Sequence, residues 1–133
     1  CDKGNYKETD SLLPINNYAW SKLGGESSVQ MLKNFLILRL SITDYPFAYK
    51  KAIKNAYSSL LFNKDFAKAL PYLLNEKGIL NIGGKRKSIY NFAKKHNTKI
   101  KSIKISKKSN FPFDSSLNTN KFKKILKKKS IKI

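Results

Sequence analysis

Basic residues are concentrated so strongly at one end of this chain that they limit what it can fold into. Residues 85–133 contain 17 Lys and Arg against a single acid, Asp114, whereas residues 1–84 contain 11 against 7. The formal net charge is +20 over 133 residues. Small folded domains usually carry a charge of about 2–8 in magnitude, because like charges repel in a compact state. The sequence therefore predicts that a polyanion binds the C-terminal third.

The length fits one domain with a modest core, since 41% of the residues are hydrophobic. Glycine, proline and asparagine interrupt any periodicity in the first 30 residues, and this favours an N-terminal extension over 1–30 followed by one domain over 31–133. The apolar side chains of the extension would anchor it on another surface; they are Leu12, Leu13, Ile15, Tyr18 and Trp20.

The order of the expected elements indicates an α+β fold. An apolar run predicts a strand over 34–42, and apolar residues at helical spacing from Tyr49 to Leu60 predict an amphipathic helix over roughly 46–61. Further elements are expected as a short helix over 64–77, strands over 79–82, 99–106 and 130–133, and a helix over 119–129 with Thr119 as its cap. This order predicts a ferredoxin-like β-α-β-β-α-β sandwich with a basic hairpin or loop.

Residues 83–99 combine two glycines, a basic cluster and the aromatic residues Tyr90 and Phe92. Cations for phosphates beside aromatic rings for bases are the composition that RNA binding needs. The candidate RNA-binding residues are Lys85, Arg86, Lys87, Tyr90, Lys94, Lys95, His96, Lys99, Lys101, Lys104, Lys107, Lys108, Lys121, Lys124, Lys127, Lys128 and Lys129. With only two arginines in the chain, we expect recognition of the shape and backbone of the RNA more than of its bases.

Two stretches resemble the family of small-subunit ribosomal protein ten. FLILRLSITDYPFAYKKAIKNA is similar to that family's opening strand, turn and helix, and SNFPFDSSLNTNKFKKILKKKSIKI is similar to its closing helix, which contains Phe122, and its terminal strand. The resemblance implies a structural constituent of the small ribosomal subunit, bound to ribosomal RNA and to neighbouring ribosomal proteins. Small-subunit ribosomal protein eight is a second, fainter resemblance.

Residues suited to catalysis are few. His96 is the only histidine, and the acids Asp44, Asp65, Glu76 and Asp114 form no spaced pair or metal motif. The glycines before Lys85 lack the spacing of a phosphate-binding P-loop. We therefore expect no enzyme activity, no cofactor, no metal and no small-molecule substrate.

Two other classes of function stay open. Cys1 at the N-terminus suggests an acylated surface lipoprotein that binds acidic ligands, and charge alone would suit a DNA-binding protein. Abundant Lys, Asn and Ile indicate an AT-rich genome, so a mitochondrial ribosome is the expected location, with a bacterial cytoplasm or a plastid as alternatives. No run of 18 apolar residues predicts a transmembrane helix.

Overall fold

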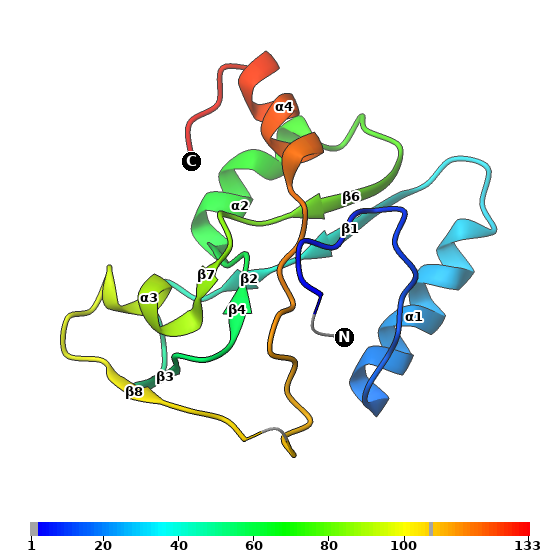
Figure 1. The fold of residues 1–133 in the computed structure, drawn as a ribbon. Coiled ribbons are helices and arrows are strands. Elements are labelled where there is room, and N and C mark those ends of the chain that lie inside the picture. Colours follow the sequence, from blue (N-terminus) through cyan, green and yellow to red (C-terminus); the bar gives the residue numbers. More distant parts are fainter. Residues whose placement is uncertain (1–2, 107) are drawn as a thin grey trace.

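Short strands and helices form a mixed α/β fold in which five strands follow α1 before the next helix (Figure 1). The computed structural model describes residues 3–106 and 108–133. The helices are α1 (Asn17–Gln30), α2 (Asn63–Ala69), a 3₁₀ turn η1 (Leu70–Tyr72), α3 (Ile89–Lys94) and α4 (Asn120–Lys128). The strands are β1 (Leu36–Leu40), β2 (Ile42–Thr43), β3 (Lys51–Ile53), β4 (Tyr57–Ser58), β5 (Leu61–Phe62), β6 (Gly78–Ile82), β7 (Lys87–Ser88) and β8 (Lys101–Ile103).

The described strands pair two by two, and most pairs are parallel. β1 lies parallel to β6, β2 to β5 and β3 to β8, while β4 and β7 are antiparallel. Ser41 joins β1 to β2: its N–H donates to the carbonyl of Ile82 at 2.9 Å, and its own carbonyl accepts from the N–H of Leu61 at 2.9 Å. One extended segment therefore changes partner from β6 to β5.

Two apolar clusters hold these pairs together. The larger one forms where α4 and α2 pack on β6, and its buried members are Ala69, Leu73, Leu80, Ile82, Phe122 and Leu126. Phe122 and Leu126 lie one helical turn apart, so α4 turns one apolar stripe inward and leaves its lysines in solvent. A smaller cluster of Ala52, Ala93 and Ile100 joins β3 to α3.

The first described residues are tied to the segment that precedes α4. The N–H of Tyr6 donates to the carbonyl of Ser116 at 2.9 Å, and the carbonyl of Tyr6 accepts from the N–H of Asn118 at 2.7 Å. The side chain of the buried Asn81 in β6 also donates to the Tyr6 carbonyl, at 2.8 Å. The division into an extension over 1–30 and a domain over 31–133 stays a prediction.

Several expected elements are confirmed. The strand predicted over 34–42 is β1 and β2, those over 79–82 and 99–106 contain β6 and β8, and the helix over 119–129 is α4. α2 and η1 occupy the first part of the helix expected over 64–77. Thr119 stands at the N-cap of α4, but its side chain makes no capping bond.

The helix expected over 46–61 is wrong, because this segment forms the strands β3, β4 and β5. Asn55 shows the physical reason. Its side chain donates to the carbonyl of Ile105 at 2.8 Å and accepts from the N–H of the same residue at 3.0 Å, so it bonds to a distant backbone instead of supporting a helix. Ala52 and Ala56, which would share a face at helical spacing, are both buried, one in β3 and the other directly before β4.

The coarse expectation of a small fold that mixes helices and strands is confirmed. The ferredoxin-like arrangement is not confirmed, because three of the four described strand pairs are parallel and each sheet has only two strands. Residues 130–133 form no strand. Within the described residues, no helix combines the length and the apolar character that crossing a membrane requires.

Candidate active site

Helix α1 begins at a well-formed cap. The side-chain oxygen of Asn16 accepts a hydrogen bond from the N–H of Ala19 at 2.8 Å, which satisfies one of the free donors at the start of the helix. The sequence predicted only irregular backbone here, because Gly24 and Gly25 interrupt the pattern. That expectation is wrong: the helix runs through both glycines to Gln30.

Tyr18 and Lys22 form a pair on the exposed side of α1. They are four residues apart, so they lie on the same face one turn from each other. The Nζ atom of Lys22 lies 5.2 Å from the centre of the Tyr18 ring, and 72% of Tyr18 is exposed. An exposed phenol group therefore lies beside a positive charge.

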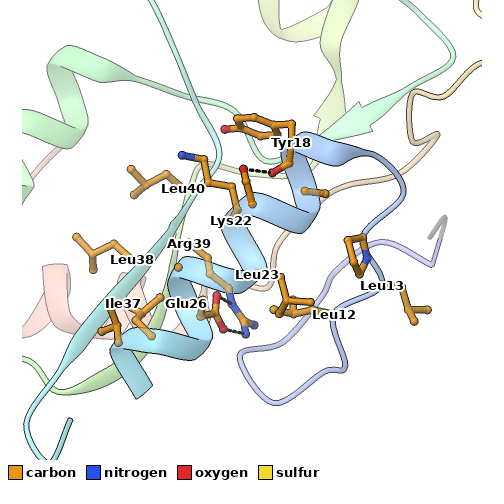
Figure 2. A pocket seen from close by; sticks show the side chains of 15 residues that line it. Leu12, Leu13, Tyr18, Lys22, Leu23, Glu26, Ile37, Leu38, Arg39 and Leu40 are labelled. Carbon is orange, nitrogen blue, oxygen red and sulfur yellow. Dashed lines mark hydrogen bonds and ion pairs between the residues drawn. The ribbon is translucent and has the colours of Figure 1, made fainter. Parts of the chain in front are cut away.

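Tyr18 and Lys22 line a groove of about 790 Å³ between α1 and β1 (Figure 2). One wall is α1, from Tyr18 to Val29. The opposite walls are β1, from Ile37 to Leu40, and the segment that leads into α1, where Leu12 and Leu13 lie. The groove is largely apolar, with Lys22, Glu26 and Arg39 as its charged side chains.

Glu26 and Arg39 fix the distance between the helix and the strand. Two nitrogens of the Arg39 guanidinium bond to the two carboxylate oxygens of Glu26, with Nε at 3.1 Å from Oε2. Both side chains are largely buried, at 15% and 10% exposure, and Arg39 also donates to the carbonyl of Glu8 at 3.2 Å. Such a two-pronged bond holds a fixed orientation. It therefore positions the face of α1 that carries Tyr18 and Lys22.

The residues predicted to bind RNA lie in several separate places. Lys85, Lys87, Lys95 and His96 surround a second, smaller pocket beside Phe92. The lysines of α4 are exposed elsewhere, as are Lys99, Lys101, Lys104 and Lys108. Lys107 and Cys1 lie outside the described residues. Tyr90 is half-buried against the smaller core cluster, with the Nζ of Lys94 5.5 Å from its ring centre. The binding role predicted for these individual residues stays a prediction.

Arg86 differs from its neighbours because it has a buried partner. Its Nε donates to Oδ2 of Asp114 at 2.8 Å, and its guanidinium carbon lies 4.2 Å from the centre of the Tyr57 ring. Burial by itself would raise the pKa of Asp114, but hydrogen bonds from Ser116 and Arg86 outweigh it and hold that pKa below its usual 3.8. Arg86 is therefore engaged in the fold.

No group of three or more His, Cys, Asp and Glu residues that could hold a metal ion occurs in the part of the chain that the structure describes.

Comparison with known proteins gives a consistent result at the level of structure. No protein-family model and no curated protein sequence matches the chain. A hypothetical dTDP-4-dehydrorhamnose reductase from Sulfolobus tokodaii is similar with a TM-score of 0.78 and 31% identity, over 93% of this chain and 53% of that one. The chain thus spans about half the length of that reductase.

Two further solved structures show the same fold at lower identity. The dTDP-4-dehydrorhamnose reductase from Bacillus anthracis, solved in complex with NADP, has a TM-score of 0.72 and 20% identity over 96% of this chain and 54% of its own. The enzyme from Yersinia enterocolitica has a TM-score of 0.69 and 23% identity over 89% and 53%. The similarity therefore extends across almost the whole chain.

These similarities correct the functional expectations from the sequence. The resemblance to ribosomal protein ten is wrong, as are the ribosomal, RNA-bound and non-enzymatic role and the lipoprotein alternative, because the similar solved structures are reductases of a nucleotide sugar. Ribosomal RNA and ribosomal proteins are likewise the wrong partners, and exclusion of a small-molecule substrate was wrong. The mitochondrial location stays a prediction.

The resemblance to ribosomal protein ten is wrong because similar sequence patterns along the chain do not determine how the strands pair in space. The stretch over 35–56 contains β1, β2 and β3, with no helix after the first strand. Sequence reasoning also missed Tyr18 and Lys22, and it treated Tyr18 only as an anchor. The available signal was a tyrosine and a lysine four residues apart, directly after the capping residue Asn16.

Proposed function

We propose that this chain forms part of a reductase that converts a keto group to an alcohol on a sugar carried by a nucleotide diphosphate, with Tyr18 as the proton donor. The observation that carries the proposal is the similarity to the Sulfolobus tokodaii reductase, at 31% identity over 93% of this chain. The exposed Tyr18–Lys22 pair at the rim of the α1–β1 groove supplies a chemical site that suits this reaction.

Reduction of a carbonyl adds a hydride to its carbon and a proton to its oxygen. Tyrosine is one of the side chains that act as general acids, provided that its hydroxyl can come within hydrogen-bond reach of the accepting atom. The ring of Tyr18 is exposed, so a carbonyl oxygen can approach its hydroxyl from the groove. Transfer of the phenolic proton would leave a phenolate on Tyr18 and an alcohol on the sugar.

Lys22 would stabilise the negative charge that forms on Tyr18 in that step. An ammonium group one helical turn away favours the negative charge that develops on the phenol oxygen, and it requires no rearrangement when the proton leaves. The Glu26–Arg39 pair neutralises the remaining charges of the groove, so the Lys22 charge stays available to Tyr18.

The dinucleotide that would deliver the hydride does not fit the residues of this chain. The sequence contains no G-x-G-x-x-G motif, which is the usual cradle for a dinucleotide pyrophosphate. Gly83 and Gly84 follow β6, but a Cβ atom there would lie 2.4 Å from the Ser59 carbonyl and 2.6 Å from that of Leu60. These glycines therefore serve close backbone packing, and the residues of this chain account for the proton only.

The exposed face of α1 is where we place the rest of such a reductase. None of the described residues of this helix is buried, and Trp20, Met31 and Leu32 are exposed at 60%, 85% and 61%. Met31 and Leu32 directly follow the helix, and large apolar side chains exposed along one element and at its end favour an interaction surface. The similar reductases are about twice as long as this chain. This supports the remaining part of a reductase as the partner of the exposed face of α1.

The experiment that tests the proposal is a reductase assay. The complete protein that carries this chain is incubated with NADPH and dTDP-4-dehydrorhamnose, and NADPH consumption is followed together with the loss of the keto sugar. We expect NADPH and keto sugar to disappear in equal amounts, with no consumption when the sugar is omitted. Binding of both compounds without any loss of the keto group would contradict the proposal.

A further inference from the structure

A second pocket, of about 190 Å³, lies apart from the α1–β1 groove and shares no lining residue with it. Its apolar floor is made by Leu61 of β5, Phe62 and Phe92. The rings of Phe62 and Phe92 are 4.8 Å apart, and the imidazole of His96 stands at 86° to the Phe62 ring with a centroid distance of 4.7 Å. The pocket therefore has packed aromatic rings at its floor and one titratable side chain, His96, at its edge.

Positive charges surround this floor with little to balance them. Lys85, Lys87 and Lys95 line the pocket, and none of them has an ion pair within the described residues. The only acidic side chain in the lining is Asp65, whose carboxylate lies 3.6 Å from Lys68. Neighbouring lysines without acidic partners repel each other, so a bound anion would relieve the repulsion in this pocket.

The environment of His96, an exposed side chain at the edge of the pocket, shows the same excess of positive charge. Burial lowers the pKa of His96 below its usual 6.5, and the charges of Lys95, Lys64 and Lys87 lower it further, against a smaller opposing effect of Asp65. Lys64 comes from α2, where its Nζ lies 3.1 Å from the centre of the Tyr45 ring, Lys87 from β7, and Lys95 follows α3. An anion in the pocket would face Lys87, Lys95 and His96 at once, whereas Lys64 lies outside the lining.

We propose that this pocket binds the phosphate group of a small ring-bearing phosphate monoester. The lysines at the rim would hold the phosphate, since lysine binds phosphate as a point charge, and the ring would lie against Phe92, because Phe62 is only 4% exposed. A volume of about 190 Å³ corresponds to about six water molecules at their liquid volume, which is enough for roughly a phosphate and one ring. His96 would donate a further hydrogen bond once protonated.

The test uses the fact that His96 is the only histidine in the chain. Its ring-proton NMR signal, identified by its absence in His96→Gln, is followed while phenyl phosphate or inorganic phosphate is added in about 0.15 M NaCl to screen loose charge attraction. We expect a saturable shift with both anions, stronger binding of phenyl phosphate, and a His96 titration midpoint that moves to higher pH when the pocket is filled. A shift that never saturates would overturn the proposal.

Two neighbouring lysines provide matched variants. Lys95→Gln removes a charge that lines the pocket, whereas Lys94→Gln removes one that lies beside Tyr90 and outside it. We expect Lys95→Gln to weaken phenyl phosphate binding roughly fivefold, and Lys94→Gln less than about twofold. Equal weakening by both would assign the binding to net charge alone. Amide spectra of the variants show separately whether each remains folded, and neither result depends on the reductase assay.

Discussion

At the scale of single residues, the geometry of Tyr18 and Lys22 gives the clearest link between structure and chemistry. Lys22→Met keeps the length of the side chain and removes its charge. We expect turnover of the keto sugar to fall by about 10²–10³-fold with a smaller change in KM, because the lost charge acts on the developing phenolate. The measurement is steady-state kinetics of the complete protein, in which a change of KM alone would point to a binding role for Lys22.

Lys33→Met is the matched control for that variant. Lys33 follows α1, is exposed and does not line the groove. It carries the same charge and loses it in the same way, so an equal fall in turnover for both variants would assign the effect to the net charge of the protein. We expect the kinetics of Lys33→Met to match those of the unchanged protein.

Asp114 joins the basic loop to the segment before α4, and its contribution to stability depends on pH. Its carboxylate accepts from Arg86 and from the N–H of Ser116, at 3.0 Å for the latter, and its pKa is lowered in the folded state. The stabilisation is therefore complete above the unfolded value of 3.8 and is lost as the pH falls through the lower folded pKa.

Asp114→Asn tests this dependence. We expect the free energy of unfolding at neutral pH to fall by roughly 1–3 kcal/mol, since Arg86 loses its charged partner, and the difference from the unchanged protein to shrink at pH values below 3.8. Urea unfolding at several pH values provides the measurement. Glu76→Gln is the control, because no ion pair is formed by Glu76 among the described residues. A difference that is constant across pH would disprove the assignment.

At the scale of elements, glycines distinguish an open helix from a tightly packed strand. A Cβ atom at Gly24 in α1 meets nothing within 4 Å, whereas one at Gly83 would lie 2.4 Å from the Ser59 carbonyl. Gly24→Ala should stabilise α1 by about 0.5–1 kcal/mol, because alanine favours helical backbone. Gly83→Ala should destabilise the fold by roughly 1–3 kcal/mol through overpacking.

Amide hydrogen exchange measures both effects in one experiment. We expect slower exchange within α1 for Gly24→Ala and faster exchange in β6 and the segment around Ser59 for Gly83→Ala. The same response to both substitutions would contradict the packing described here. The comparison also separates a local change in α1, which has no buried residue, from a change in the core.

The sequence predicted an element correctly where the signal comes from neighbouring residues, and failed where distant contacts decide the structure. The apolar run before Ser41 and the stripe of Phe122 and Leu126 are properties of neighbouring residues, so β1 and α4 were predictable. The segment over 46–61 carries a helical pattern, yet β3 within it pairs with the distant β8, and the Asn55 side chain bonds to the backbone of Ile105. Only tertiary contacts decide such a case.

The candidate site was less predictable than the fold. Lysines dominate the composition and directed attention to the C-terminal third, whereas the Tyr18–Lys22 pair lies in a segment interrupted by two glycines. Its meaning depends on the groove that β1 forms opposite α1, which no local pattern describes.

At the scale of the whole molecule, the net charge of +20 over these 133 residues is large compared with the four ion pairs of the described residues. Repulsion among unpaired lysines disfavours the compact state, and salt screens it. We expect the melting temperature to rise when NaCl is increased from about 0.02 to 0.2 M, as measured by circular dichroism. A melting temperature that falls with salt would show that the few ion pairs outweigh the repulsion.

The most direct test of the central claim is the effect of one hydroxyl on turnover. Tyr18→Phe removes the proposed proton donor, and Tyr49→Phe removes an equally accessible phenol that lies outside the groove, since the two tyrosines are 72% and 67% exposed. With the complete protein, NADPH and dTDP-4-dehydrorhamnose, we expect Tyr18→Phe to lower turnover by about 10²–10⁴-fold while Tyr49→Phe leaves it unchanged. Full turnover by Tyr18→Phe would contradict the account.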